Sequence, residues 1–215
     1  VTGTITAGAG TPYVFNQYTS PATWAKPTGL KSIKVTVVGA GGSGGPILSN
    51  PVGVNSATGG GGGGGGAVYY APAPSIPGPI SITAGSGTNS FGALVSCTAG
   101  SNGATAPGSP SNPFTTGGAG GTGTISAPAP AGSFAISGGG GTSAASNLLG
   151  GMGAGGLFGL GAFGAARFAP SDGSGAGFAA TGYGAGGGGA AKSAVANAYS
   201  GGAGTPGIVI IEEFY

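Results

Sequence analysis

The stretch Thr58–Tyr70, "TGGGGGGGGAVYY", determines how the rest of the chain must be interpreted. Glycine loses more backbone freedom on folding than any other residue. Ordering the eight glycines of this run costs about 8–16 kcal/mol, at about 1–2 kcal/mol each. The run has no side chains that could offset this cost by burial. It is therefore either a flexible linker or a segment whose backbone itself serves as the packing surface.

The composition favours an ordered backbone. Of the 215 residues, 56 are Gly and 16 are Pro, a share that is normally typical of low complexity or disorder. Disordered chains, however, combine low hydrophobicity with high net charge. Here only 4% of the residues are charged and the net charge is +2. We therefore expect an ordered chain with an unusual core, and we keep the flexible linker as the alternative.

Glycines recur at intervals of three in several blocks, among them Gly39, Gly42 and Gly45, and Gly201, Gly204 and Gly207. Three residues per turn is the period of the polyproline II helix, in which a glycine on one side lets two backbones approach closely. That helix has no internal hydrogen bonds, so its N–H and C=O groups need partners on neighbouring segments. The spacing predicts a lattice of polyglycine-type helices, the eight-glycine run included, in place of a hydrophobic core.

Short apolar stretches frame the glycine blocks. "SIKVTVVG" at Ser32–Gly39, the residues around Ile80 and Ile82, and "GIVIIEEFY" at Gly207–Tyr215 have the alternation or β-branched content of strands. The predicted fold class is mostly β and irregular: short β-strands framing polyglycine-II helices, with little or no α-helix. We expect the first and last of these strands to pair as a structural base that brings together Trp24, Val35, Val37, Ile208 and Ile210.

The side chains needed for catalysis or metal binding are scarce. The chain has no His and a single cysteine, Cys97, so the sequence offers no Cys/His metal site and no Cys–His nucleophile. Glu212 and Glu213 are adjacent on a predicted strand and point to opposite faces, so we expect a solvated strand end. Five basic residues form no phosphate-binding stripe. We predict no enzyme activity, no cofactor, no metal and no nucleic-acid partner.

Three motif-like stretches are interpreted as chance matches. Gly39, Gly41 and Gly44 have the spacing of a dinucleotide fingerprint, but no helix and no nearby acidic residue follow. "GGGGAAKS" at Gly186–Ser193 resembles a phosphate loop, but Ala191 stands where the second glycine belongs. Leu148–Ala166 is uncharged like a membrane span, but its many glycines oppose a helix. We predict no membrane insertion.

The order of the blocks carries a family resemblance. "TWAKPTGLKSIKVTVVGAGGSGG" at Thr23–Gly45 is followed by "GGGGGGGGAVYYAPAPSIPGPISITAGSG" and finally by "PGIVIIE" at Pro206–Glu212. This succession resembles the glycine-rich domain at the ends of bacteriophage tail-fibre proteins. The resemblance covers about residues 15–215, a tip domain, with residues 1–14 expected to be a linker or a shaft-connecting segment.

The resemblance implies a non-enzymatic adhesin of the virion, outside the cell, in which polyglycine-II helices form the core. The loops between these helices would contact a host receptor, either a cell-surface glycan or an outer-membrane protein. Other tail-fibre subunits are implied as partners, either in a homotrimer or with this chain as a monomeric cap on a trimeric shaft. Two alternatives stay open: a purely structural fibre or spike protein, and, less favoured because its inter-glycine residues are too mixed, an ice-binding protein.

Large side chains between the glycine blocks are the candidate site residues, because a lattice of backbone cannot bury them. Aromatic residues and arginine dominate binding hot spots. The predicted receptor contacts are Asn112, Phe114, Arg167, Phe168 and Tyr199. A second set, Leu157, Phe158 and Phe163, has the apolar density of an oligomer interface or a small buried cluster.

Overall fold

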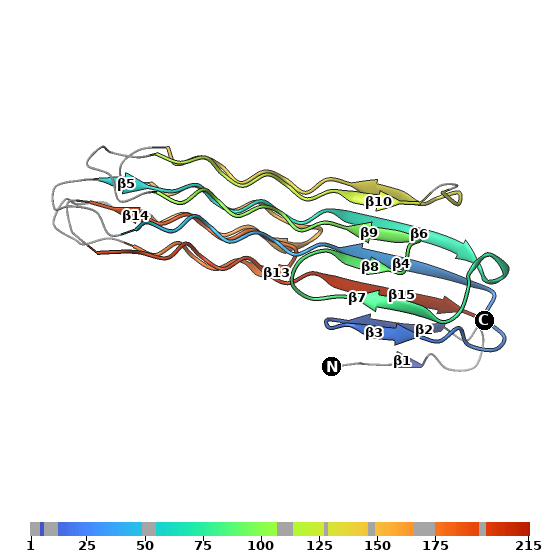
Figure 1. Cartoon of the computed structure of the whole chain (residues 1–215). Coiled ribbons are helices and arrows are strands. Elements are labelled where there is room, and N and C mark those ends of the chain that lie inside the picture. The colour runs from blue at the N-terminus through green and yellow to red at the C-terminus, as the bar shows by residue number, and fades with distance from the viewer. Residues whose placement is uncertain are drawn as a thin grey trace.

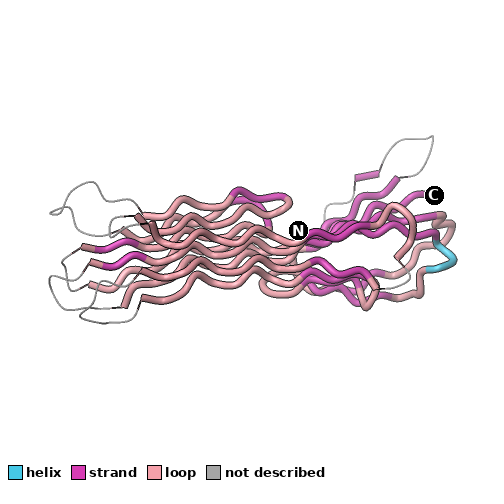
Figure 2. The backbone as a smooth tube through the Cα atoms, turned by 90° about the horizontal axis from the view of Figure 1, so that it is seen from above, coloured by secondary structure: helices cyan, strands magenta, loops and turns pink. Residues whose placement is uncertain are grey.

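The computed structural model describes residues 5–6, 13–48, 55–106, 114–126, 129–145, 149–165, 175–193 and 197–215 (Figure 1). The molecule is elongated. Two antiparallel sheets lie at one end, which we call the sheet end, and glycine-rich segments run side by side from them to the opposite, distal end (Figures 1 and 2). The long axis joins these two ends.

The strands at the sheet end form two sheets in which every pairing is antiparallel. In sheet order the six-stranded sheet contains β1 (Ile5–Thr6), β2 (Tyr13–Tyr18), β15 (Ile208–Phe214), β4 (Ser32–Val38), β6 (Gly66–Pro72) and β11 (Phe134–Ile136). The five-stranded sheet contains β10 (Gly123–Ile125), β9 (Val95–Cys97), β8 (Asn89–Phe91), β7 (Ile80–Thr83) and β3 (Ala22–Trp24). The boundary expected between residues 14 and 15 thus falls inside β2.

The glycine-rich part carries two further strand pairs. β12 (Phe158–Leu160) pairs with β13 (Thr181–Tyr183), and β14 (Ala191–Lys192) pairs with β5 (Ser56–Ala57). The one described helix is η1, a 3₁₀ turn at Ala73–Ser75. The expected mostly-β fold with almost no helix is confirmed. Within the described residues, no helix is long and apolar enough to cross a membrane.

The two sheets enclose the largest apolar core of the described residues. β4 and β15 pair along their whole length, with Val37 opposite Val209 and Val35 opposite Ile211. Trp24, Val35 and Val37 belong to this core, as the sequence predicted. The contribution of β15 differs from the expectation: Val209 and Ile211 join the cluster, whereas Ile208 is buried outside it and Ile210 is half-buried. Successive residues of a strand face opposite sides of the sheet. The expectation therefore named the two residues of β15 that face away from this core.

The same alternation buries Glu213, which corrects the expectation of a solvated strand end. Glu213 is 4% exposed and lies on the inner face of β15. Its Oε1 accepts hydrogen bonds from Trp24 Nε1 at 2.6 Å and from Asn16 Nδ2 at 3.0 Å, and its Oε2 accepts one from the Tyr215 hydroxyl at 2.9 Å. A buried carboxylate needs such partners because desolvation is otherwise costly. Glu212, on the outer face, forms an ion pair with Lys34 at 2.7 Å.

The glycine-rich body consists of extended segments that bond to one another through their backbones. The central segment, residues 58–65, shows the pattern. The N–H groups of residues 60–65 donate in rotation to three neighbours, around residues 98–101, 139–142 and 184–187, whereas Gly59 N donates to Thr115 Oγ1. The C=O groups of the central segment accept from three others, around residues 39–45, 118–121 and 151–154. Each neighbour is met again every third residue, as in Gly61 N to Gly187 O and Gly64 N to Gly184 O, both at 2.8 Å.

The other segments extend this arrangement in three rows. The segment 184–190 is also surrounded on six sides, because it bonds to residues 39–45, 58–64, 150–154, 162–165, 175–178 and 202–205. The bonds order the outer segments into a row of 98–106, 39–47 and 197–207 and a row of 137–145, 149–156 and 161–165. Between these rows lie 114–122, 55–65, 184–193 and 175–180.

Close approach of the backbones leaves no room for side chains at the contacts. A Cβ atom added to Gly61 would overlap the carbonyl of Gly42, and one added to Gly64 would overlap the carbonyl of Gly39. Each residue of Gly59–Gly65 meets neighbouring backbone in this way. The glycine run is therefore required by the packing around it.

Candidate functional site

The distal end is where the glycine-rich segments approach their connections. Large and β-branched side chains replace glycine there, and bridges join the segments laterally: Ile47 pairs with both Ala106 and Tyr199, and Ala57 pairs with Phe114. Two small apolar clusters close this end of the body. One contains Ile47, Ala106 and Ala190 with Tyr199 packed against them, and the other contains Ala57, Ala165 and Ala191 with Ala144.

Two of the predicted receptor contacts are described, and both lie at the distal end. Phe114 bridges to Ala57 of β5, and its side chain is 50% exposed. Tyr199 bridges to Ile47 and is half-buried against the first small cluster. Phe114 is thus open to a partner, whereas Tyr199 also holds the end of the body together. The other three predicted contacts, Asn112, Arg167 and Phe168, lie outside the described residues.

The second predicted set lies elsewhere, on the side of the body. Phe158 is in β12, next to Leu157, and Phe163 is in the following extended segment. All three side chains are exposed, and Phe163 most of all at 70%. Among the described residues, these three side chains belong to no buried cluster. Their predicted alternative role, in an oligomer interface, stays a prediction.

Lys192 is a residue whose environment the sequence did not reveal. It is fully buried in β14, and within the described residues its Nζ has no hydrogen-bond partner. Burial lowers the pKa of its ammonium group, because the charged form loses its hydration. The phosphate-loop-like match that ends here therefore does not present a lysine to a ligand. No pattern in "GGGGAAKS" distinguishes a buried lysine from an exposed one.

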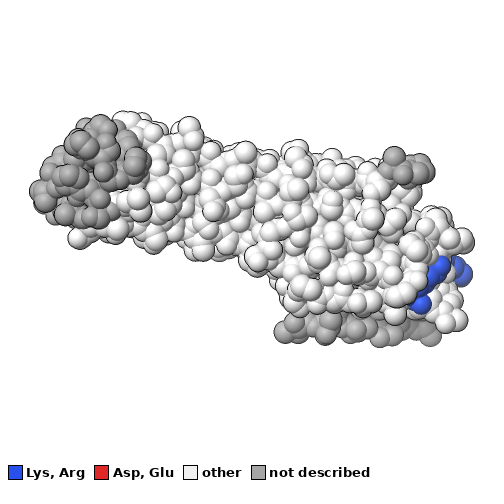
Figure 3. All heavy atoms as spheres, viewed as in Figure 1, with Lys and Arg blue, Asp and Glu red and all other residues white. Residues whose placement is uncertain are grey.

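The described charges are otherwise gathered at the sheet end. On the face shown in Figure 3, basic side chains appear at that end and the described body is uncharged. Tyr13 donates a hydrogen bond to Glu212, and Tyr215 donates one to Glu213. Burial together with these carboxylates raises the pKa of each phenol to about 12.

The Cys97 thiol donates a hydrogen bond to Val37 O at 3.2 Å, and burial raises the pKa of this thiol to about 12. A thiol held protonated in this way is a poor nucleophile.

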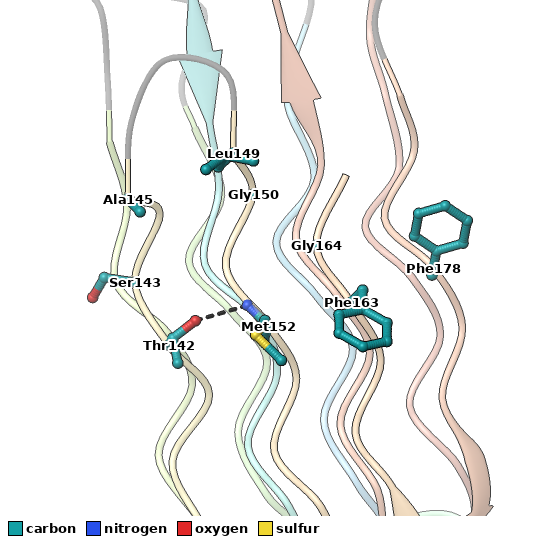
Figure 4. Close-up of a pocket in the computed structure, with 9 residues that line it drawn as sticks. All are labelled: Thr142, Ser143, Ala145, Leu149, Gly150, Met152, Phe163, Gly164 and Phe178. Carbon is teal, nitrogen blue, oxygen red and sulfur yellow. Dashed lines mark hydrogen bonds between the residues drawn. The ribbon is translucent and has the colours of Figure 1, made fainter. Parts of the chain in front are cut away.

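The side of the body carries a hollow of about 520 Å³ (Figure 4). Its lining is mostly apolar, with Leu149 and Met152 on one side and Phe163 and Phe178 on the other. Sequence reasoning named Phe163 but missed the other three. For Leu149 and Met152 the signal that could have found them is the period of three, because they are three residues apart on one segment. Phe178 has no such signal in the sequence.

No protein-family model matches this chain, and a search of curated proteins finds no match either.

Proposed function

We propose that the protein is the tip of a phage tail fibre, or a related virion surface protein, that binds a host cell-surface receptor without catalysis. The observation that carries this proposal is the difference between the two ends of the elongated body. The first and last long strands, β2 and β15, pair with each other at the sheet end. The bridges among residues next to the segment connections, such as Ile47 to Tyr199, lie at the opposite end. One end thus suits attachment and the other suits presentation of loops.

The rigid support for those loops would be a bundle of polyglycine-II helices. Three facts support this finer description of the body. Hydrogen bonds to a given neighbour recur every third residue, as expected for three residues per turn. The segments 58–65 and 184–190 each have six bonded neighbours, as in hexagonal packing. Added Cβ atoms would overlap neighbouring backbone throughout Gly59–Gly65.

The ligand class follows from what the distal end exposes. Phe114 offers an aromatic face that could stack on a sugar ring or pack against an apolar side chain of a protein loop. A cell-surface glycan and an outer-membrane protein therefore both fit the proposal. Non-enzymatic binding agrees with the protonated state of Cys97 and the engagement of Glu212 and Glu213 in contacts at the sheet end.

Competition for adsorption tests this proposal. The purified protein should block adsorption of the corresponding phage to its host, and a Phe114→Ala variant should block less well. Phe134→Ala is the matched control, because Phe134 is also 50% exposed but lies in β11 at the sheet end. Both variants should keep the thermal stability of the parent. A protein that binds no host cell, or a Phe114→Ala variant that competes as well as the Phe134→Ala control, would contradict receptor contact at this position.

A further inference from the structure

The side of the body presents a continuous set of large apolar side chains. Leu149, Met152, Phe163 and Phe178 are 43%, 45%, 70% and 62% exposed. They come from three neighbouring segments, which are joined by the bond from Gly150 N to Ala165 O at 2.9 Å and the bond from Phe178 N to Phe163 O at 3.4 Å. Isolated exposed apolar residues are normal, but a contiguous group next to a hollow indicates an interaction surface.

This surface, which we call the ridge-and-hollow face, has two parts side by side. Phe163 and Phe178 form the ridge. The hollow lies between this ridge and Leu149 and Met152, and Gly150 and Gly164 of the same segments also line it (Figure 4). The two parts are displaced from each other across the segments, that is, perpendicular to the long axis.

The face has no charge among its described residues. The described charged side chains belong to the sheet end, except for Lys192, which is fully buried. A charged partner would therefore lose hydration here without gaining an opposite charge. We therefore expect the partner to present an uncharged, apolar surface. The ridge-and-hollow face is itself such a surface.

The exposed area is large enough to form the centre of a stable contact. Phe163 and Phe178 together expose about 260 Å², at 70% and 62% of roughly 200 Å² per ring. That is about a third of the roughly 800 Å² that each partner contributes to a standard interface. Leu149, Met152 and the lining of the hollow add to it, and Thr142 and Ser143 provide a polar rim.

We propose that this face is the contact between two copies of the chain, related by a two-fold axis parallel to the long axis. A rotation about such an axis, placed between the ridge and the hollow, lays the ridge of each copy over the hollow of the other. A two-fold axis that lies in the face but runs across the segments would lay ridge on ridge instead. The isologous arrangement uses one patch twice and closes on itself.

The direction of the axis has a consequence for the assembly. Rotation about an axis parallel to the long axis leaves both distal ends pointing the same way, so the pair presents two sets of distal connections together. A three-fold assembly, such as the expected homotrimer, brings two different patches into contact and does not pair this ridge with this hollow. The pairing goes beyond the proposed receptor role. Its test measures the mass of the assembly in solution and does not depend on adsorption to a host.

Sedimentation equilibrium tests the pairing with the protein as it is. The mass should rise from that of one chain to that of two with increasing concentration. The double variant Phe163→Ser/Phe178→Ser removes both rings of the ridge from each copy, and we expect the dissociation constant to rise at least about 100-fold. Phe134→Ser is the control, since it removes an equally large exposed ring at the sheet end. Melting temperatures equal to that of the parent, measured at a concentration low enough for the parent to be monomeric, show that the variants fold.

Engineered cysteines test the direction of the axis. A Met152→Cys variant mixed with a Phe178→Cys variant should form a mixed disulfide efficiently, whereas Phe178→Cys alone should not link to itself, because Phe178 is the ridge residue farther from the axis. The native Cys97 is fully buried and does not interfere. A chain that stays monomeric at about 100 µM, forms trimers or open-ended aggregates, or associates equally well after loss of the ridge overturns the proposal. So does efficient self-linking through Phe178→Cys, which an axis across the segments would produce.

Discussion

Replacing Gly61 by alanine gives a direct test of backbone packing in the body. Gly61 lies in the central segment, and its added Cβ would overlap the carbonyl of Gly42. That carbonyl accepts a hydrogen bond from Gly187 N at 2.9 Å. The segments 58–65 and 39–45 are also joined by the bond from Gly42 N to Gly62 O at 2.8 Å. The methyl group must therefore push apart two segments that bond to each other and to a third.

The cost follows from the bonds that must be lost. A buried donor or acceptor left without a partner costs about 1–3 kcal/mol, and the shift of Gly42 breaks two such bonds. We expect Gly61→Ala to lower the free energy of unfolding by about 2–6 kcal/mol. That is a large share of the roughly 5–15 kcal/mol that stabilises an ordinary domain. For a chain of this length the melting temperature should fall by roughly 5–20 °C.

Gly140→Ala is the matched control. Its Cβ would have Gly118 O as its nearest contact at 3.7 Å, which is ordinary van der Waals distance, and its backbone is not left-handed. This exchange should raise stability by about 0.4–1 kcal/mol, because alanine restricts the unfolded chain. Chemical denaturation monitored by circular dichroism compares the two variants with the parent. If Gly61→Ala and Gly140→Ala unfold at the same denaturant concentration, close backbone contact does not hold the body together.

Two further predictions concern buried charge. Lys192→Met should raise the free energy of unfolding by about 1–3 kcal/mol at pH 7, since it removes an amine without a described partner. Because the pKa of Lys192 is lowered in the folded state, the parent gains stability as pH rises from that folded pKa to the ordinary 10.5. The advantage of Lys192→Met should therefore shrink toward pH 10.5, and unfolding curves that show a constant advantage, or a loss, would contradict the assignment. Glu213→Ala should cost about 3–5 kcal/mol because it leaves Trp24 and Asn16 without their acceptor, whereas Glu212→Ala, which breaks a half-exposed pair with Lys34, should cost about 1 kcal/mol. Equal costs in denaturation experiments would show that Glu213 is solvated after all.

The candidate site was predictable only in part. Phe114 and Tyr199 could be named because large side chains do not fit between close backbones, and both lie at the distal end. The half-burial of Tyr199 against Ile47 could not be foreseen, because the two residues are far apart in the sequence. Phe178 was missed for a similar reason. It becomes part of a ridge only because its segment lies beside that of Phe163.

The sequence by itself determined the local requirements of the chain. Strand-like alternation around Val35 and Val37, the scarcity of helix and the period of three in the glycine blocks are all local patterns, and each limits which conformations a segment can adopt. Only the tertiary structure decided which segments became neighbours, and thereby buried Glu213 and Lys192 while leaving Phe163 exposed. The physical reason is that glycine backbones are nearly identical to one another. A glycine segment therefore specifies that it needs close neighbours, but the chain's connections and its few large side chains specify which neighbours those are.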